Sequence, residues 1–331
     1  MAQSRMEVPF FNSAALKGNY LQDPVSRNLH IYLPEAYFQY KNKRFPVVYY
    51  LTGYASRGAS MMNQIPWGET IQQQMDRLIA SGACQPLILV LPDCFTRLGG
   101  SQYINSTCTG NYEDYILEIV RHIDTNYRTE ADRVCRAVAG KSSGGFGALY
   151  LAMHYPDIFG IVLDHSGDKF FEAAYYPDLL RLPDLLSGHD LQTVIHDPYN
   201  YEPKNGDFFQ LMNLSAMAAC YSPNPSAPFG FDWPVDPYTA ELREEVWLRW
   251  LAYDPVRLVD SFQENLKALK LLYFDCGNND EYFLHLGSRL LHRRLESLGI
   301  LHHYEEFVGG HRHTRFRLDT HLEILSKTFF G

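Results

Sequence analysis

Apolar runs of strand length alternate along the chain with segments whose apolar residues recur at helical spacing. Strands are expected at residues 28–33, 45–51, 86–91, 133–139, 161–164, 269–275 and about 304–308. Helices are expected from Tyr112 through Ile123, at 146–154, and at about 283–298 and 314–329. This alternation is typical of an α/β fold, in which helices cover both faces of a mostly parallel sheet.

One stretch, at about 168–266, breaks the alternation. It is rich in Tyr, Phe, Trp and Pro, as in FGFDWPVDPY and VWLRWLAYDP, and it is too long for a plain connection. We interpret it as a cap-like insertion folded over one end of the sheet, within a single domain that spans residues 1–331. Its aromatic side chains are expected either to line an apolar cleft or to pack into a small core of the insertion itself.

Composition and charge narrow the choice of partners. The chain has 331 residues, 46% of them hydrophobic and 20% charged, as expected for a globular protein with a large core. A net charge of −9 and the lack of any Lys/Arg-rich run argue against nucleic acid or a membrane as the main partner. A small-molecule substrate is therefore expected, and homo-oligomerisation stays open.

The cysteines and the first residues bear on the compartment. The opening sequence lacks the apolar core of a signal peptide, and no later stretch is long enough to span a bilayer. Six cysteines show no CxxC pattern. We therefore expect reduced, buried thiols in a cytoplasmic protein, with a Cys94–Cys108 pair as the alternative if the protein is exported.

The segment VAGKSSGGFG, residues 138–147, stands between an expected strand and an expected helix. A strand-to-helix turn that exposes one side chain leaves almost no room for a Cβ two residues before or after it. Gly140 and Gly144 have this spacing about Ser142, which gives the G-x-S-x-G pattern of a nucleophile elbow. Ser143 as the exposed residue would put Lys141 at a crowded position, so Ser142 is predicted to be the nucleophile. The alternative is a glycine-rich turn made only for close packing.

A serine hydroxyl needs an orienting carboxylate behind its base, and this fold supplies the two in the order Asp/Glu, then His. Asp280 lies in the loop beyond the strand expected at 269–275 and is the favoured acid. Asp275 is still on that strand, where the pleat dictates its direction, and Glu281 is the third option.

The base is expected after the last strand, in the segment VGGHRH. His311 directly follows two glycines on the loop and is favoured over His313. The two histidines could instead form a metal pair, but no third ligand is evident nearby. His302 and His303 are interpreted as strand or surface residues.

Acyl transfer also needs donors for the developing oxyanion. The backbone N–H of Ser143 is one expected donor, and the second should come from Thr52-Gly53-Tyr54, after the strand at 45–51. Gly53 allows close approach of the substrate, and the Tyr54 amide is the chosen donor, with its side chain pointing into the cleft. The alternative for this segment is an ordinary flexible turn.

Together these motifs resemble the putative-esterase family of α/β-hydrolases, which includes S-formylglutathione hydrolases, feruloyl esterases, enterochelin esterases and the antigen 85 mycolyltransferases. The segments that carry the resemblance, between about residues 28 and 325, are IYLPEAY, FPVVYYLTGY, VLPD, GGSQYINS, GNYEDYILEIVRHIDTNYR, GKSSGGFGAL, LYFDCGNNDEY and VGGH. The resemblance implies an α/β-hydrolase fold and the same roles for Ser142, Asp280, His311, Tyr54 and Ser143.

The sequence also departs from the family pattern. Thr52-Gly53 replaces the usual His-Gly of the oxyanion loop, and RHTRF follows Gly-Gly where an aromatic tail is common. The cysteine-bearing oxyanion loop of formylglutathione hydrolases is missing, which counts against glutathione thioesters.

The expected activity is that of a serine carboxylesterase acting on small or aromatic carboxylic esters through an acyl-enzyme, with no cofactor and no metal implied. One alternative is an acyltransferase, in which an alcohol replaces water. Another is a catalytically silent binding module, which the complete Ser/Asp/His set argues against. The acyl and alcohol groups of the substrate stay open.

Overall fold

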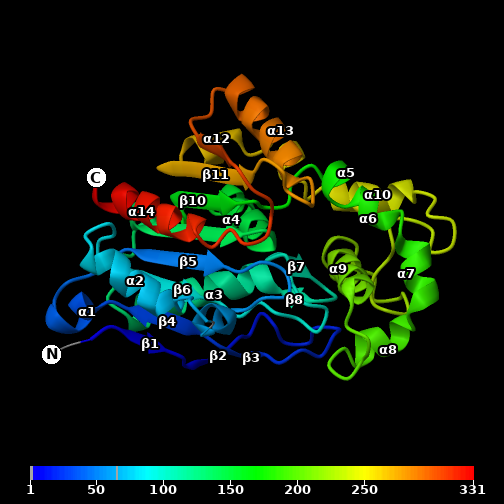
Figure 1. Ribbon diagram of the computed structural model, residues 1–331, viewed down its shortest axis with the longest axis horizontal. Helices are drawn as coiled ribbons and strands as arrows, with labels where there is room; N and C mark the ends of the chain where they lie inside the picture. The colour runs from blue at the N-terminus through cyan, green and yellow to red at the C-terminus, as the bar shows by residue number, and fades with distance from the viewer. Residues whose placement is uncertain (1–2, 65) are drawn as a thin grey trace.

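A central eight-stranded sheet organises the computed structural model, which describes residues 3–64 and 66–331 (Figure 1). Its strands, in spatial order, are β1 (Arg5–Glu7), β4 (His30–Leu33), β6 (Ile88–Leu91), β5 (Val47–Leu51), β9 (Arg136–Lys141), β10 (Ile161–His165), β11 (Leu271–Gly277) and β12 (His303–Phe307). Neighbours from β6 to β12 are parallel, whereas β1 and β4 pair antiparallel. The predicted mostly parallel α/β sheet is confirmed.

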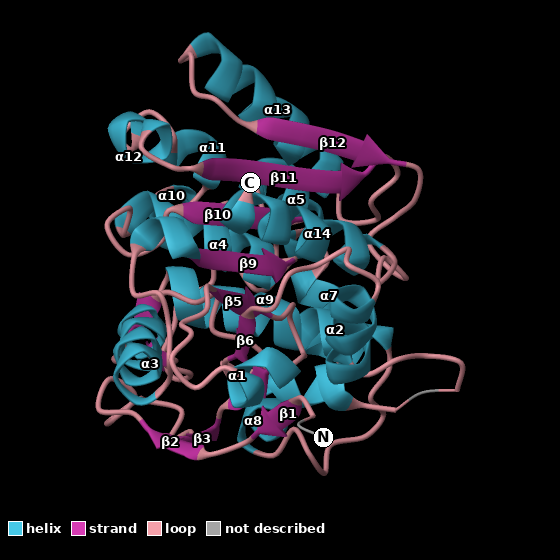
Figure 2. Ribbon diagram, turned by 90° about the vertical axis from the view of Figure 1, so that its left-hand side faces the viewer, coloured by secondary structure: helices cyan, strands magenta, loops and turns pink. Residues whose placement is uncertain are grey.

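Helices cover both faces of this sheet, whose strands are seen stacked from β12 to β1 in Figure 2. One face carries α3 (Tyr112–Asn126), α4 (Ser143–His154) and α13 (Leu284–Ser297), and the other carries α2 (Ile71–Ala80) and α14 (Arg317–Phe330). The sequences fit these places, because α2 and α14 bury one apolar stripe each, whereas α4 is apolar nearly all round and is almost wholly buried.

Short elements complete this part of the chain. They are the strand pairs β2 (Phe10–Asn12) with β3 (Ser26–Asn28) and β7 (Asn105–Ser106) with β8 (Gly110–Asn111), the helix α1 (Glu35–Gln39), and the 3-10 turns η1 (Gly58–Met62) and η2 (Arg133–Cys135). The strand expected at 133–139 begins only at Arg136, because Asp132 accepts a hydrogen bond from the Val134 N–H and caps η2. The first two helices and β1 were not among the expected elements.

The segment 168–266 holds eight helices, most of which lie beyond the ends toward which the parallel strands point (Figure 1). They are α5 (Phe171–Ala174), α6 (Tyr176–Leu179), α7 (Leu182–Gly188), α8 (Leu191–His196), α9 (Gly206–Tyr221), α10 (Glu244–Leu251), α11 (Pro255–Leu258) and α12 (Gln263–Lys267). The last two run back alongside α4 and α13.

Most aromatic residues of this segment pack against one another rather than line a cleft. Phe171, Tyr175, Tyr221 and Trp250 are buried together, with the Tyr175 and Trp250 rings 5.6 Å apart in an edge-to-face arrangement. Most of these aromatic residues therefore pack into a core, as one of the two expectations has it, but the core is shared with Phe146 and Tyr150 of α4.

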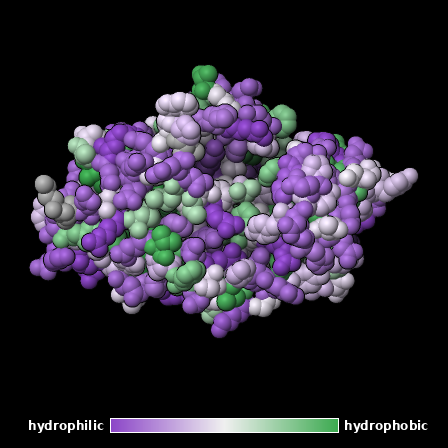
Figure 3. Space-filling model, turned by 60° about the horizontal axis from the view of Figure 1, so that its bottom comes forward, coloured by the Kyte–Doolittle hydropathy of each residue, from purple (hydrophilic) through white to green (hydrophobic). Residues whose placement is uncertain are grey.

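Three further features concern the molecular surface, the cysteines and the helices. The face seen in Figure 3 is mainly hydrophilic, with hydrophobic residues scattered over it. All six cysteines are unpaired and all but Cys135 are buried, so the alternative Cys94–Cys108 disulfide is not formed. None of the helices in the described ranges has the length and apolar character needed to cross a bilayer.

Candidate active site

Ser142 occupies the sharp turn between β9 and α4, with φ +57° and ψ −125°, a backbone conformation that non-glycine residues rarely adopt. The two glycines predicted at the crowded positions are the ones the turn requires. A Cβ at Gly140 would lie 2.2 Å from the Gly144 carbonyl oxygen, and a Cβ at Gly144 would lie 2.0 Å from the Leu51 carbonyl oxygen. Ser143 is the first residue of α4 and is buried. The elbow therefore has the predicted register.

His311 lies between Ser142 and Asp280. Its Nε2 is 3.0 Å from Ser142 Oγ, and its Nδ1 is 2.8 Å from Asp280 Oδ2. Because a carboxylate only accepts hydrogen bonds, Nδ1 carries the proton in the neutral ring. Nε2 then accepts a hydrogen bond from the serine hydroxyl. Asp280 and His311 lie in the loops after β11 and β12, which come together because parallel strands end at the same edge of the sheet.

Asp280 is suited to remain ionised beside the imidazole. Burial of its carboxyl group would raise the pKa, but the hydrogen bond from His311, the charge of that ring and the N–H of Tyr282 together hold the pKa below its ordinary value. A carboxylate in this state fixes the ring orientation and stabilises the imidazolium that forms when the serine gives up its proton.

The loop after β5 lies directly against the serine. A Cβ at Gly53 would be 3.3 Å from Ser142 Cβ, and the Tyr103 hydroxyl donates to the Thr52 carbonyl oxygen at 2.6 Å. Tyr54 borders the cavity, but its hydroxyl donates to the Leu98 carbonyl oxygen at 2.8 Å. The side chain expected to point into the cleft is thus tied to the cavity wall.

Glu281 and His313, the alternative candidates for the acid and the base, do not contact Ser142 in the way that His311 does. Glu281 accepts the backbone N–H of His311 and lies against Gly310, so it braces the histidine loop from outside. His313 is exposed at φ +59° and lines a separate, smaller cavity. The two histidines of the H-x-H pair thus face different cavities, and the structure does not bring them together as metal ligands.

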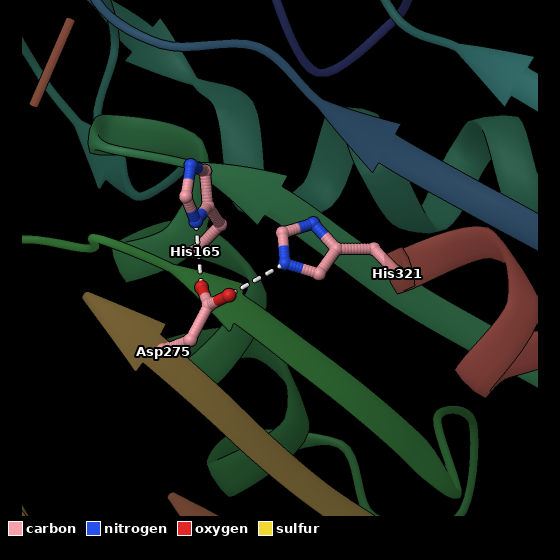
Figure 4. Close-up of side chains that lie close together, drawn as sticks. All are labelled: His165, Asp275 and His321. Carbon is pink, nitrogen blue, oxygen red and sulfur yellow. Dashed lines mark hydrogen bonds and ion pairs between the residues drawn. The ribbon is translucent and has the colours of Figure 1, made fainter. Parts of the chain in front are cut away.

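Asp275 lies on β11 at the centre of a second cluster, which sequence reasoning missed. His165 Nδ1 donates to its Oδ1 at 2.6 Å, and His321 Nε2 donates to its Oδ2 at 2.8 Å (Figure 4). Arg317 Nε donates to Oδ2 at 2.9 Å. His165 Nε2 accepts from the Thr314 hydroxyl at 2.8 Å. No motif links these residues, because His165 and Asp275 lie far from each other and from the C-terminal segment that supplies Thr314, Arg317 and His321.

The three groups His165, Asp275 and His321 lie close enough to suggest a metal site. The donor set does not fit one, because a guanidinium already contacts the carboxylate and would repel a cation there. Burial lowers the pKa of His165 to about 4, against the opposing effect of Asp275, so the ring is neutral. The cluster is a closed hydrogen-bond network.

The cavity in front of Ser142 has a volume of about 950 Å³ and a lining of both polar and apolar groups. Asp168, which the sequence analysis did not single out, is buried in its wall. Its Oδ2 accepts hydrogen bonds from Gln102 Nε2 at 2.9 Å and the Tyr175 hydroxyl at 2.8 Å. Its position just after β10, at the same sheet edge as the serine, is the one signal that could have found it.

The chain matches the family described as "Putative esterase" over residues 24–321. It is 30% identical over 255 residues to an esterase of Mycobacterium tuberculosis, covering 72% of this chain and 44% of that protein. It is 31% identical over 158 residues to an endo-1,4-beta-xylanase/feruloyl esterase of Xylanibacter ruminicola, covering 46% of this chain and 20% of that protein. The chain thus spans less than half the length of these relatives.

Solved structures agree on the fold. A ferulic acid esterase superposes with a TM-score of 0.65 at 20% identity, covering 99% of this chain and 100% of the other. An S-formylglutathione hydrolase of Staphylococcus aureus superposes with a TM-score of 0.61 at 16% identity, covering 99% of each chain. The fold is that of the α/β-hydrolases, as predicted, and because the match extends from the first long strand to the final helix, this chain belongs to the putative esterase family.

Proposed function

We propose that this chain is a serine carboxylesterase in which Ser142 is the nucleophile, His311 the general base and Asp280 the residue that orients it. The observation that carries the proposal is the continuous arrangement Asp280–His311–Ser142, with contacts of 2.8 and 3.0 Å, on a strained turn that opens into a cavity. Membership of an esterase family and esterase relatives support the same reaction class.

The reaction follows from these positions. His311 Nε2 takes the proton of Ser142 Oγ as the oxygen attacks the ester carbonyl carbon. The backbone N–H groups of Ser143 and Tyr54 donate to the oxyanion of the tetrahedral intermediate. The imidazolium returns the proton to the departing alcohol and leaves an acyl-serine. Water, deprotonated by the same ring, then releases the carboxylic acid.

The proposed substrates are small or aromatic carboxylic esters. The cavity is large enough for an aromatic acyl group, and its wall includes the rings of Tyr175, Phe209 and Tyr282. Amide side chains of Gln210 and Asn213 lie in the same wall and can hydrogen bond to hydroxyl groups of such a substrate. Feruloyl esterase relatives are consistent with this class.

A fluorophosphonate probe and a panel of esters test the proposal. The protein is expected to be labelled on Ser142 and to hydrolyse 4-nitrophenyl esters of short chain length as well as methyl ferulate. The Ser142→Ala variant should be neither labelled nor active. A protein that hydrolyses none of the esters and is not labelled would contradict the proposal.

A further inference from the structure

A second cavity of about 240 Å³ adjoins the catalytic one on the far side of the oxyanion loop. Gly53, Ser56 and Lys141 line both cavities, so the small cavity begins beside the serine. Its remaining lining residues come from the end of β5 and the loop after it, from η1 and β10, and from α14 with the loop before it. They are Tyr50, Thr52, Met61, His165, His313, Thr314, Arg315, Leu318 and His321.

The charge of this lining is opposite to that of the whole chain. The sequence has 38 acidic against 29 basic residues and a net charge of −9. Within the described residues, however, the small cavity is lined by the two cations Lys141 and Arg315 and by no carboxylate; of its three histidines, His165 is neutral. A concave site of one charge sign concentrates ligands of the other sign.

Lys141 is half-buried, and the described part of the chain offers it no ion-pair partner. Burial lowers its pKa, whereas the more distant Asp280 and Glu281 oppose that shift. Arg315 is exposed, and its side chain contacts the neutral Oε1 of Gln74 at 3.4 Å. Neither cation is matched by a neighbouring anion.

A neutral hydrogen-bond donor, the hydroxyl of Tyr50, also lines the small cavity. The Tyr50 hydroxyl has no hydrogen-bond partner in the described ranges, and burial raises the pKa of that group, so it keeps its proton and donates. Asp275 lies behind His165 and His321, but Arg317 already contacts it. The lining therefore presents several donors to a ligand that can only accept.

We propose that this cavity binds a carboxylate group carried by the ester substrate, with Lys141 and Arg315 as its cationic partners. The inference rests on the proposed esterase function and names a substrate class for the same site. Ionised carboxylates form the stronger, charge-assisted hydrogen bonds with such donors. The volume is several times that of a water molecule, roughly 30 Å³ in the liquid, so a carboxylate fits together with its remaining waters.

The test compares kcat/KM for two matched pairs of esters. In the first pair the charge is on the acyl group, with mono-4-nitrophenyl glutarate against 4-nitrophenyl pentanoate. In the second pair it is on the alcohol, with the acetyl ester of 3-hydroxybenzoate against that of 3-hydroxybenzamide. The wild-type protein is expected to prefer the anionic ester by roughly 10- to 100-fold in one of the pairs.

The variants Lys141→Met and Arg315→Met should each lower this preference by about tenfold, because each removes one charge-assisted contact. The ratio within a pair cancels any general loss that Lys141→Met causes beside the serine. Lys267→Met is the matched control, since it removes the same charge from the exposed helix α12 and should leave the preference unchanged.

The inference would be overturned if kcat/KM for the neutral ester equals or exceeds that for the anionic ester in both pairs. It would also be overturned if the preference for the anionic ester survives both substitutions. Failure of the proposed function has a different signature. In that case none of the four esters is hydrolysed and the fluorophosphonate probe leaves Ser142 unlabelled.

Discussion

The molecule contains two Asp–His–hydroxyl arrangements with almost the same geometry. In one, His311 connects Asp280 to Ser142 through contacts of 2.8 and 3.0 Å. In the other, His165 connects Asp275 to the Thr314 hydroxyl through contacts of 2.6 and 2.8 Å. Distances alone would give either one the role of a catalytic triad.

Their surroundings separate them. Asp275 also accepts hydrogen bonds from Arg317 and His321, which hold its pKa, together with His165, far below the ordinary value despite burial. Thr314 is nearly fully buried and borders only the small cavity, whereas Ser142 opens into the large one. Ser142 itself has the strained backbone and is followed by the N–H of the first residue of α4, whereas at Thr314 the positive φ belongs to the preceding residue, His313.

The comparison teaches that access, backbone strain and oxyanion donors distinguish a reactive arrangement from a structural one. In the closed network, both oxygens of the Asp275 carboxylate accept hydrogen bonds from other residues of the protein. The carboxylate of the open arrangement supports a ring whose far nitrogen faces a hydroxyl beside a cavity. The predictions below set the two against each other.

The largest expected contrast is between the two hydroxyls. Ser142→Ala should lower kcat by roughly 10⁴- to 10⁶-fold, because the nucleophile is lost. Thr314→Ala should leave kcat within about tenfold, because its hydroxyl only completes the closed network. Rates with 4-nitrophenyl acetate, with a melting curve for each variant, measure both effects. An active Ser142 variant beside a folded, inactive Thr314 variant would reverse the assignment.

The two carboxylates come next. Asp280→Asn should lower kcat by about 10⁴-fold with little change in stability, since an amide donor favours the wrong tautomer of His311. Asp275→Asn should instead lower the free energy of unfolding by roughly 1–3 kcal/mol, because it weakens the buried contacts with His165, His321 and Arg317, although Arg317 keeps its ion pair with Glu305.

Denaturant unfolding and kcat, both measured below the temperature at which either variant melts, separate these roles. A stable but inactive Asp275 variant together with a near-normal Asp280 variant would contradict them.

The closed network should also make stability depend on pH. The pKa of His165 is lowered from 6.5 to about 4 in the folded protein, so between these values the unfolded chain binds a proton that the folded protein excludes. Stability therefore falls as the pH drops through this window, by roughly 3 kcal/mol in full. The low pKa of Asp275 acts in the same direction but at still lower pH.

His165→Asn keeps a donor toward Asp275 without a titrating ring. The difference in unfolding free energy between pH 7 and pH 4 should be smaller in this variant than in the wild type by the amount just given. An unchanged difference would show that His165 does not carry the effect.

The smallest expected effect belongs to Ser143. Its proposed contribution is the backbone N–H, which Ser143→Ala keeps, so kcat should change by less than about tenfold. The alanine variant also fits sterically, because it only removes the hydroxyl oxygen. A loss comparable to that of Ser142→Ala would place the elbow one residue further along.

Sequence alone predicted the parts of the site that depend on local backbone geometry. Gly140 and Gly144 reveal the elbow because the turn excludes a Cβ, and the loops that bear Asp280 and His311 follow recognisable strands. Apart from α2, which has ten residues, the helices that cover the sheet and its strands from β4 to β12 were found through their apolar periodicity. The three-residue β1 was not, because so short a strand carries almost no periodic signal.

The closed network and the small basic cavity could not be predicted in this way. Both depend on side chains brought together by the order of strands in the sheet, with His165 on β10 and His321 on α14. Asp168 is a further case, since its burial depends on Gln102 and Tyr175, which come from a loop and from the segment 168–266. Tertiary contacts of this kind leave no fixed spacing in the chain.

The segment 168–266 has a consequence for how this protein could diversify. Ser142 precedes it, and Asp280 and His311 follow it, so no member of the proposed triad lies within it, although the segment forms much of the cavity wall. The proposed triad and much of the cavity wall therefore lie in separate parts of the sequence, whereas Lys141 and Arg315 of the small cavity lie outside the segment. Recombination between homologues that exchanges only this segment should therefore change the substrate selectivity that the cavity wall determines, without changing Ser142, Asp280 or His311.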